Sequence, residues 1–189
     1  PGQIKKAAKA ILSSERPVIY AGGGAIYSNA AKELSELNKI LKVPVTNTLM
    51  GLGVYPAKNK LFLGMLGMHG TYQANMAMHN ADLILAVGSR FDDRITNTPS
   101  LFAPNAKIVH IDVDPASISK IIKADIPIVG QVKDSLQALI KEIKRSKIKI
   151  DTDAIDIWNI QIDKWRKKHG LDPDLYQKKL KSKMIMPQV

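Results

Sequence analysis

Short apolar runs that end in glycine or polar residues constrain the fold of this chain more than any other feature. Residues 82–87, "DLILAV", form the clearest buried strand, and the chain continues directly into Gly88 and Ser89. Such runs alternate with longer segments, for example residues 133–145, whose apolar residues recur at helical spacing. The alternation predicts a parallel sheet with helices on both faces. The expected fold class is therefore α/β, with three layers in the order α/β/α.

The same pattern indicates the individual elements and the domain organisation. Strands are predicted at residues 17–21, 43–46, 62–63, 82–87, 107–112 and 126–129. Helices are predicted at residues 2–14, from Ser28 or Asn29 to Leu41, at residues 71–80 and 133–145, and at residues 151–169 with Gly170 as the stop. We expect residues 1–150 to form a single domain. Residues 151–189 are too few to make a core of their own, so we expect a helical connector to a further domain there.

The net charge of +11 raises the question of nucleic-acid binding. Residues 1–140 carry 15 basic and 10 acidic side chains, whereas residues 141–149 alone carry five basic side chains and one acidic one. Aromatic residues make up only 5% of the chain, and none lies within this basic run, so platforms for base stacking are missing. A solvated helix end explains the charge better than a nucleic-acid site, and we expect no nucleic-acid partner.

Other features of the composition restrict the class of protein. The chain has no cysteine, which excludes disulfides, thiolate catalysis and cysteine-based metal sites and fits a reducing cytoplasm. No apolar run reaches the ~20 residues that span a bilayer, and no signal-peptide pattern is present, so we expect a cytoplasmic protein without a membrane partner. Because Pro1 stands where a native chain has methionine, we expect a piece of a longer protein.

Glycine and polar residues gather at the carboxyl ends of five predicted strands. In an open parallel sheet these ends share one edge, which is where such folds bind nucleotide-like ligands. Turn formation alone explains a glycine at a strand end, but it does not explain two arginines and two aspartates in one loop. We therefore favour a ligand crevice over a set of ordinary turns. The segments are Gly22-Gly23-Gly24 and residues 47–51, 88–94, 112–114 and 130–132.

The glycines after the first strand indicate a phosphate-binding turn, but they do not complete a dinucleotide fingerprint. Gly22 and Gly24 match G-x-G and can present backbone amides to a pyrophosphate, whereas Tyr27 stands where the third glycine belongs. The second strand ends in Thr46-Asn47-Thr48 instead of an acid for the ribose hydroxyls. A conventional NAD site is therefore disfavoured, and Asp112, after a later strand, is the candidate to bind a ribose.

The loop "GSRFDDR" supplies charge at the same edge. Arg90 and Arg94 can bind phosphates through bidentate contacts, with Asp92 and Asp93 holding the arginines or meeting ligand donors. The alternative is a surface cluster of ion pairs, each worth ~0–1 kcal/mol. Both interpretations stay open at this point.

The histidines do not indicate a metal site or a catalytic one. His69 and His79 lie ten residues apart without a nearby cluster of carboxylates, so we expect no metal ligands. His110 lies inside an apolar strand and is predicted to be a core histidine with its hydrogen bonds satisfied.

Four motifs resemble, in order and spacing, the middle domain of the large catalytic subunits of acetohydroxyacid synthases, also called acetolactate synthases. They are "YAGGGA", "TLMGLG", "LGMLGMHGTYQANMAMHNADLILAVGSRFDDR" and "HIDVDPASISK". The resemblance covers about residues 1–140. In the tail, "WNIQIDKWR" and "PQV" are similar to the segment that leads into the third domain of these enzymes.

The resemblance implies a fold, an activity and partners. Enzymes of this family have three domains, use thiamine diphosphate with Mg2+, and condense two pyruvates, or pyruvate and 2-ketobutyrate, with loss of CO2. The products lead to valine, leucine and isoleucine. The resemblance implies that the middle domain has a six-stranded parallel, Rossmann-like sheet and binds FAD in a mainly structural role. It also implies a homodimer of full-length subunits with a regulatory small subunit.

The resemblance also assigns individual residues. Met68, Asp93 and Arg94 match positions that border the substrate channel, while Met65 is expected in the core. Gly130-Gln131 departs from the more usual Gly-Asp at its position, which leaves that corner of the adenosine site less defined. The positions that match FAD-contacting motifs are Gly22, Gly23, Gly24, Thr48, Leu49, Met50, Leu66, Gly67, Met68, His69, Gly88, Ser89, Arg90, Asp92, Arg94, Asp112, Val113, Gly130 and Gln131.

Two motifs of the family are missing from this sequence. They are the glutamate that activates thiamine and the Gly-Asp-Gly…Asn-Asn motif that holds its diphosphate through magnesium. The resemblance therefore implies a monomeric fragment that binds FAD, holds no catalytic residue or metal ligand, and makes no acetolactate alone. The alternative is a stand-alone nucleotide-binding module for ADP, NAD or a CoA group, as in related thiamine enzymes whose middle domain binds another nucleotide or has lost it.

Overall fold

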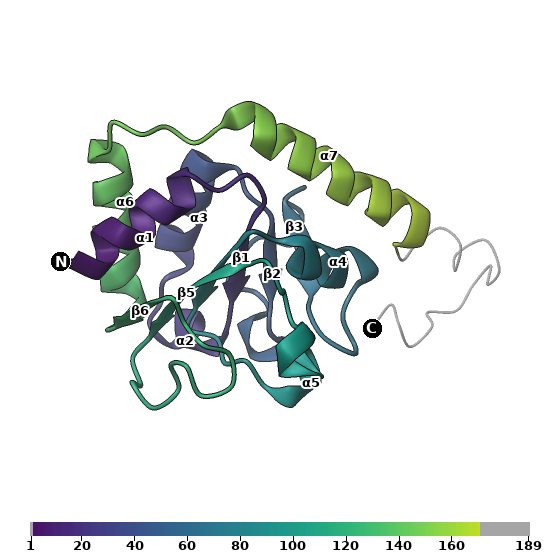
Figure 1. Cartoon of the computed structure of the whole chain (residues 1–189), viewed down its shortest axis with the longest axis horizontal. Helices are drawn as coiled ribbons and strands as arrows, with labels where there is room; N and C mark the ends of the chain where they lie inside the picture. Colours follow the sequence, from purple (N-terminus) through teal and green to yellow (C-terminus); the bar gives the residue numbers. More distant parts are fainter. Residues whose placement is uncertain (1, 171–189) are drawn as a thin grey trace.

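The computed structural model describes residues 2–170, and Figure 1 shows a central sheet with helices on both faces. The six strands are all parallel and lie in the order β3-β2-β1-β4-β5-β6. This architecture confirms the predicted fold class. The strands are β1 (Pro17–Ala21), β2 (Val45–Asn47), β3 (Phe62–Met65), β4 (Leu83–Val87), β5 (Lys107–Asp112) and β6 (Ile126–Val129).

The helices form the two outer layers. Helices α1, α3 and α6 pack on one face of the sheet, and α4 and α7 pack on the other (Figure 1). The helices are α1 (Gly2–Leu12), α2 (Gly23–Tyr27), α3 (Ala31–Leu41), α4 (Tyr72–Asn80), α5 (Asp93–Thr96), α6 (Val132–Arg145) and α7 (Thr152–His169). Two short 3-10 helices, η1 (Leu49–Gly51) and η2 (Pro99–Leu101), lie in loops.

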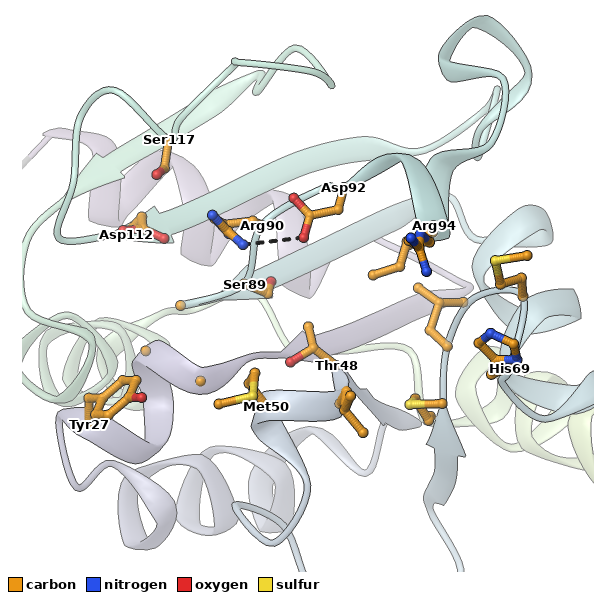
Figure 2. A pocket seen from close by; sticks show the side chains of 18 residues that line it. Tyr27, Thr48, Met50, His69, Ser89, Arg90, Asp92, Arg94, Asp112 and Ser117 are labelled. Carbon is orange, nitrogen blue, oxygen red and sulfur yellow. Dashed lines mark hydrogen bonds and ion pairs between the residues drawn. The ribbon is translucent and has the colours of Figure 1, made fainter.

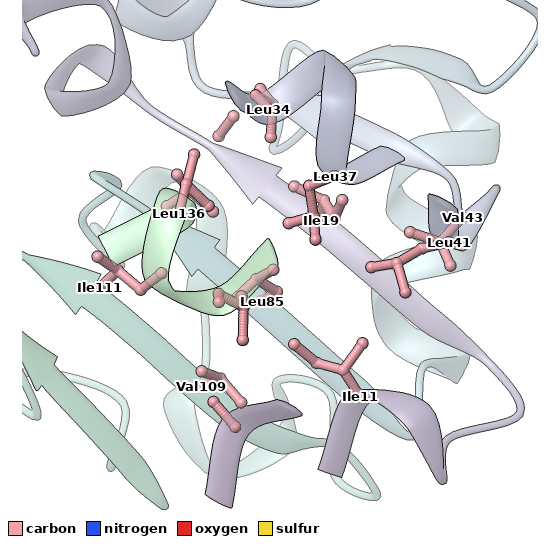
Figure 3. Packing of buried hydrophobic residues seen from close by; sticks show 14 of the residues in the cluster. Ile11, Ile19, Leu34, Leu37, Leu41, Val43, Leu85, Val109, Ile111 and Leu136 are labelled. Atoms are coloured by element: carbon pink, nitrogen blue, oxygen red, sulfur yellow. The ribbon is translucent and has the colours of Figure 1, made fainter. Parts of the chain in front are cut away.

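Alternate residues of the central strands build the larger core. Ile19, Leu85 and Val109 point to the face under α1, α3 and α6, where they join Leu37 and Leu136 in one buried cluster (Figure 3). Their neighbours along each strand point to the opposite face, because side chains alternate along a strand. Both faces are buried, which explains why these strands are continuous apolar runs in the sequence.

Helix α7 packs against the domain along its whole length. Ile155 joins the core on one face of the sheet, and Trp158 joins the core on the other, where its indole N–H donates to the Pro17 carbonyl at 3.2 Å. Near the end of the helix, Arg166 donates to two carbonyls beside β3. The helix expected at residues 151–169 is thus confirmed. Residues 171–189 of the expected connector lie outside the described residues, and the boundary at residue 150 stays a prediction.

The segment after β1 differs from its prediction. The glycines begin the short helix α2 instead of only ending the strand, and the predicted cap at Ser28 or Asn29 is wrong. Helix α3 begins at Ala31 without a side-chain cap, while the Ser28 hydroxyl closes α2 by donating to the Gly24 carbonyl at 2.8 Å. Glycine disfavours helices, so α2 depends on the packing of its backbone against Gly88 in the loop after β4.

Candidate functional site

A topological switch point lies between β1 and β4. These strands are neighbours in the sheet, but the chain leaves β1 toward β2 on one side and leaves β4 toward β5 on the other. In open α/β sheets a crevice forms at the carboxyl ends of such strands, and the order β3-β2-β1-β4-β5-β6 is that of dinucleotide-binding folds. The loops after β1 and β4 meet there, since the Gly24 N–H donates to the Gly88 carbonyl at 2.9 Å.

Close contact between these two loops requires their glycines. A Cβ atom on Gly22 would lie 2.3 Å from the Gly88 carbonyl oxygen, and one on Gly24 would lie 2.9 Å from the Gly88 Cα. Gly88 has a φ of +57°, and a Cβ there would lie 2.7 Å from the Ala25 backbone nitrogen. These glycines are therefore explained by one backbone approaching another.

An elongated cavity of about 580 Å³ lies along the carboxyl ends of the strands. Figure 2 shows Tyr27, Asp112 and Ser117 at one end, and His69 and Arg94 at the other. A volume of this size is typical of cofactor sites.

Charged groups of the loop after β4 lie over the middle of this cavity. Arg90 forms an ion pair with Asp92 at 3.4 Å, and their side chains are 72% and 50% exposed (Figure 2). Such an exposed pair contributes only ~0–1 kcal/mol, so an incoming anion can compete for Arg90. The Asp93 carboxylate accepts from the Arg94 backbone N–H at 2.9 Å and does not hold the Arg94 guanidinium. Within residues 2–170 no ion pair involves Arg94.

Apolar side chains at the mouth of the cavity are unusually exposed. Leu49 and Met50 are 68% and 63% exposed, Met68 is 70% exposed, and Tyr27 is 83% exposed. Thr48 fixes the η1 turn that presents Leu49 and Met50, because its hydroxyl accepts from the Gly51 N–H at 2.9 Å. Exposed apolar side chains that gather around one cavity indicate a surface that something covers.

A network of turns forms the Asp112 end of the cavity. The Asp112 carboxylate accepts from the Asp114 N–H at 2.9 Å, and Asp114 accepts from the Ser117 hydroxyl at 2.8 Å. That hydroxyl and the Ala116 N–H lower the pKa of the Asp114 carboxyl. One carboxylate and one hydroxyl, Asp112 and Ser117, therefore face the same end of the cavity.

Comparison with known proteins identifies the family. Residues 4–139 match the family described as "Thiamine pyrophosphate enzyme, central domain". The chain belongs to this family. Its central-domain fold thus agrees with the resemblance seen in its motifs.

Curated relatives of this central domain are acetolactate synthase large subunits. The chain is 46% identical to "Acetolactate synthase isozyme 3 large subunit" of Escherichia coli over 98% of its own length and 32% of that protein. It is 49% identical to the large subunit of Buchnera aphidicola subsp. Acyrthosiphon pisum over 98% of the chain and 32% of that protein. It is 54% identical to "Probable acetolactate synthase large subunit" of Methanocaldococcus jannaschii over 79% of the chain and 25% of that protein. The chain spans about a third of the length of the first two.

Most of the residues predicted for the site line this cavity of the central domain. They lie together because all six parallel strands end at the same edge of the sheet. The predicted residues that line the cavity are Gly23, Gly24, Thr48, Leu49, Met50, Leu66, Met68, His69, Gly88, Ser89, Arg90, Asp92, Arg94 and Asp112.

Six predicted residues do not line it. Gly22 packs against the β4 loop, as described above. Gly67 has a φ of +106°, and a Cβ there would lie 2.9 Å from the Arg94 carbonyl oxygen, so backbone packing explains this glycine as well. The other four, beside the cavity or at the end of β6, are Asp93, Val113, Gly130 and Gln131.

The cavity also has residues that the sequence did not predict. Met65, expected in the core, is only partly buried at the end of β3 and lines the cavity. Tyr27 belongs to the unpredicted helix α2, and Ile95 belongs to α5. Ser117 follows Asp114 in a turn, and the motif "DPAS" was the signal that could have placed it beside Asp112.

The histidines have different environments. His69 is exposed and lines the cavity, while His110 is fully buried in β5, as predicted for a core histidine. The prediction that its hydrogen bonds are satisfied is only half right, because the ring pairs with the Ser89 carbonyl at 2.9 Å while Nδ1 has no partner. In the described part of the chain no three histidines or carboxylates group as metal ligands. No helix there is both long and apolar enough to cross a membrane.

Proposed function

We propose that the cavity binds FAD in an extended conformation across the switch point. The observation that carries this proposal is the pairing of Arg90 and Arg94 with exposed apolar side chains in one elongated cavity. A dinucleotide needs cationic groups for its phosphates and apolar surface for its rings. A carboxylate beside a hydroxyl, as at Asp112 and Ser117, suits the ribose of an adenosine.

The residues present fit the parts of FAD. Arg90 would hold the pyrophosphate, with the exposed Asp92 giving up its weak pair. Met68 and His69, which both line the cavity, would contact the flavin, and the Asp112 end would take the adenosine. FAD would supply an isoalloxazine ring in a mainly structural role. The residues of this chain would bind and orient it and exclude water from its faces.

We further propose that the chain works as the central domain of an acetolactate synthase. The support is its similarity to acetolactate synthase large subunits, whose length is about three times what the chain spans. In the full-length enzyme, thiamine diphosphate and Mg2+ would be held by the other two domains, and 2-keto acids would pass Met68, Asp93 and Arg94. The full-length subunit would be a cytoplasmic homodimer with a regulatory small subunit.

Titration with FAD tests the first proposal. We expect saturable quenching of FAD fluorescence by the purified chain, and a weaker response for Met68→Ala and His69→Ala. Ile157→Ala is the matched control, because Ile157 is 68% exposed on α7, away from the cavity lining. Saturable binding that the cavity variants leave unchanged would place FAD elsewhere, and no binding at all would contradict the proposal for this chain.

A second candidate is a site for ADP or NAD, and the dinucleotide-type strand order favours it. The same titration with ADP and NAD as competitors separates the two. If ADP or NAD binds at micromolar concentrations and FAD does not, the second candidate replaces the first.

Assays of acetolactate formation test the wider proposal. The purified chain with pyruvate, thiamine diphosphate, Mg2+ and FAD should form none, whereas the protein encoded by the extended reading frame should form it. Acetolactate formation by the chain alone would contradict the proposal that the other two domains hold thiamine diphosphate and Mg2+. An inactive extended protein that binds thiamine diphosphate would contradict the assigned activity.

A further inference from the structure

Two buried polar side chains lie under the loop that follows β4. The His110 ring pairs with the Ser89 carbonyl at 2.9 Å, and the Tyr20 hydroxyl donates to the Arg90 carbonyl at 3.4 Å. The Ser89 hydroxyl in turn donates to the Tyr20 carbonyl at 3.0 Å. His110 and Tyr20 are both fully buried. Two consecutive carbonyls of a cavity-lining segment are therefore held from the core side.

The peptide geometry makes these contacts directional. The chain has no cis peptide bond among its described residues, and in a trans peptide the C=O and the following N–H point in opposite directions. Since the Ser89 carbonyl points toward His110, the Arg90 N–H points away from the core. The Arg90 carbonyl likewise points toward Tyr20, so the Phe91 N–H points away from the core. The contacts below the loop thus determine the orientation of the backbone at Arg90.

The protonation of His110 follows from its partner. A carbonyl oxygen only accepts, so Nε2 carries the hydrogen, and burial lowers the pKa of the ring and keeps it neutral. Nδ1 is then a bare acceptor without a partner. An unpaired buried acceptor is destabilising, so an apolar side chain would fill this space better. The feature that an apolar side chain lacks is the Nε2–H donor.

The aromatic neighbours hold the ring in place. Phe91 packs edge-on against His110 with ring centroids 5.3 Å apart, and it lies 5.7 Å from the Tyr20 ring. Phe91 follows Arg90 directly, so the loop also packs on the two side chains that hold its carbonyls.

We propose that His110 is a positioning residue of the cavity, whose Nε2–H holds the Ser89 carbonyl and thereby orients the backbone that presents Arg90 to the ligand. Tyr20 makes a second and longer contact of the same kind. The part of this inference that concerns ligand affinity rests on the proposed binding of FAD. The part that concerns the backbone of the loop does not.

Three variants separate positioning from core filling. His110→Gln keeps an amide donor near the place of Nε2, and His110→Leu fills the space without a donor. Val109→Ala is the matched control, because Val109 is fully buried in the same strand but faces the other core. Each variant is measured by hydrogen exchange of residues 88–92 without ligand, by FAD affinity and by melting temperature.

We expect His110→Leu to raise the exchange of residues 88–92 and to weaken FAD binding about tenfold, as for one lost hydrogen bond. His110→Gln should keep the exchange of residues 88–92 and the FAD affinity close to their wild-type values. Val109→Ala should lower the melting temperature and leave the exchange and the FAD affinity unchanged. If exchange and affinity follow melting temperature across all three variants, or if His110→Gln behaves as His110→Leu, the inference is overturned. If the wild-type chain does not bind FAD, the proposed function fails, while the exchange measurement still decides the role of His110.

Discussion

The two ends of strands β1 and β4 differ in how their polar groups are satisfied. At the amino ends, the Asp82 carboxylate accepts from the backbone N–H groups of Glu15 and Arg16 at 2.7 and 3.0 Å, and Trp158 donates to Pro17. At the carboxyl ends, Arg90 is mostly exposed in a long ion pair, and apolar side chains line an open cavity. At the amino ends the chain satisfies these polar groups itself, whereas at the carboxyl ends it leaves an open cavity, where we propose that a ligand binds.

The largest effect on stability should come from the amino end. Trp158→Ala removes a side chain of α7 that is 3% exposed and packs against the sheet, so we expect a loss of about 3–5 kcal/mol in the free energy of unfolding. Trp158→Phe keeps a ring and should lose much less. Chemical denaturation measures both. Loss of FAD binding by Trp158→Ala protein that is still folded would contradict the separation of the two ends of the sheet.

The next effect concerns the glycines of the carboxyl end. Gly88→Ala combines a positive φ of +57° with a clash against α2, and we expect it to cost about 3 kcal/mol. Gly53 is the matched control, since its φ is +95° but a Cβ there would meet nothing within 4 Å. Gly53→Ala should cost only about 1 kcal/mol of backbone strain. Equal losses in the free energy of unfolding for the two variants, measured by urea denaturation, would contradict this prediction. They would show that the close approach of the loops after β1 and β4 does not add to the cost of Gly88→Ala.

Sequence patterns predicted the strands and the position of the cavity better than they predicted the contacts of individual glycines. β1, β5 and β6 have their predicted bounds and β4 starts one residue later than predicted, because apolar runs buried on both faces leave a strong signal. The bounds of the two remaining strands were less accurate: β2 is residues 45–47 instead of 43–46, and β3 is residues 62–65 instead of 62–63. The cavity was found because parallel strands end at one edge. The close backbone contacts of Gly22 and Gly67 were not predicted, since a glycine that faces a ligand and one that faces another backbone look alike in a sequence.

The remaining differences between prediction and structure also come from packing between segments, which a local sequence pattern does not show. Helix α2 begins with two glycines, which disfavour helices, and its backbone packs against Gly88 in the loop after β4. Tyr27 therefore reaches the cavity from an element that no local pattern indicates. Met65 was assigned to the core because methionine is usually buried, but the end of β3 turns it toward the cavity.

A smaller effect is the pH dependence from His110. Burial lowers the pKa of the folded-state ring, against the opposing influence of Ser89 and Asp112, so the unfolded chain binds a proton first as the pH falls. Stability from this group is therefore complete above the unfolded pKa of about 6.5 and is lost below it, by at most about 1.4 kcal/mol per pH unit. Melting temperatures of wild type and His110→Gln between pH 7.5 and 5 measure this. Parallel curves would mean that His110 does not titrate differently on unfolding.

The smallest effect on stability should come from the exposed charges at the cavity. Arg90→Met removes one partner of a pair whose side chains are 72% and 50% exposed, and surface changes of this kind stay within about 0.5 kcal/mol. The same variant should weaken FAD binding about tenfold, because a charge-assisted hydrogen bond to phosphate is lost.

The control for this variant is Arg145→Met, which makes the same change in charge at an exposed arginine in the last turn of α6. It should affect neither stability nor FAD affinity at moderate salt. Equal weakening of FAD binding by both variants would mean that only the net positive charge of the chain attracts the ligand. A selective loss with Arg90→Met would instead assign the affinity to the carboxyl ends of the strands, where Arg90 is only weakly paired with Asp92 and the phosphate of the proposed ligand would be its stronger partner.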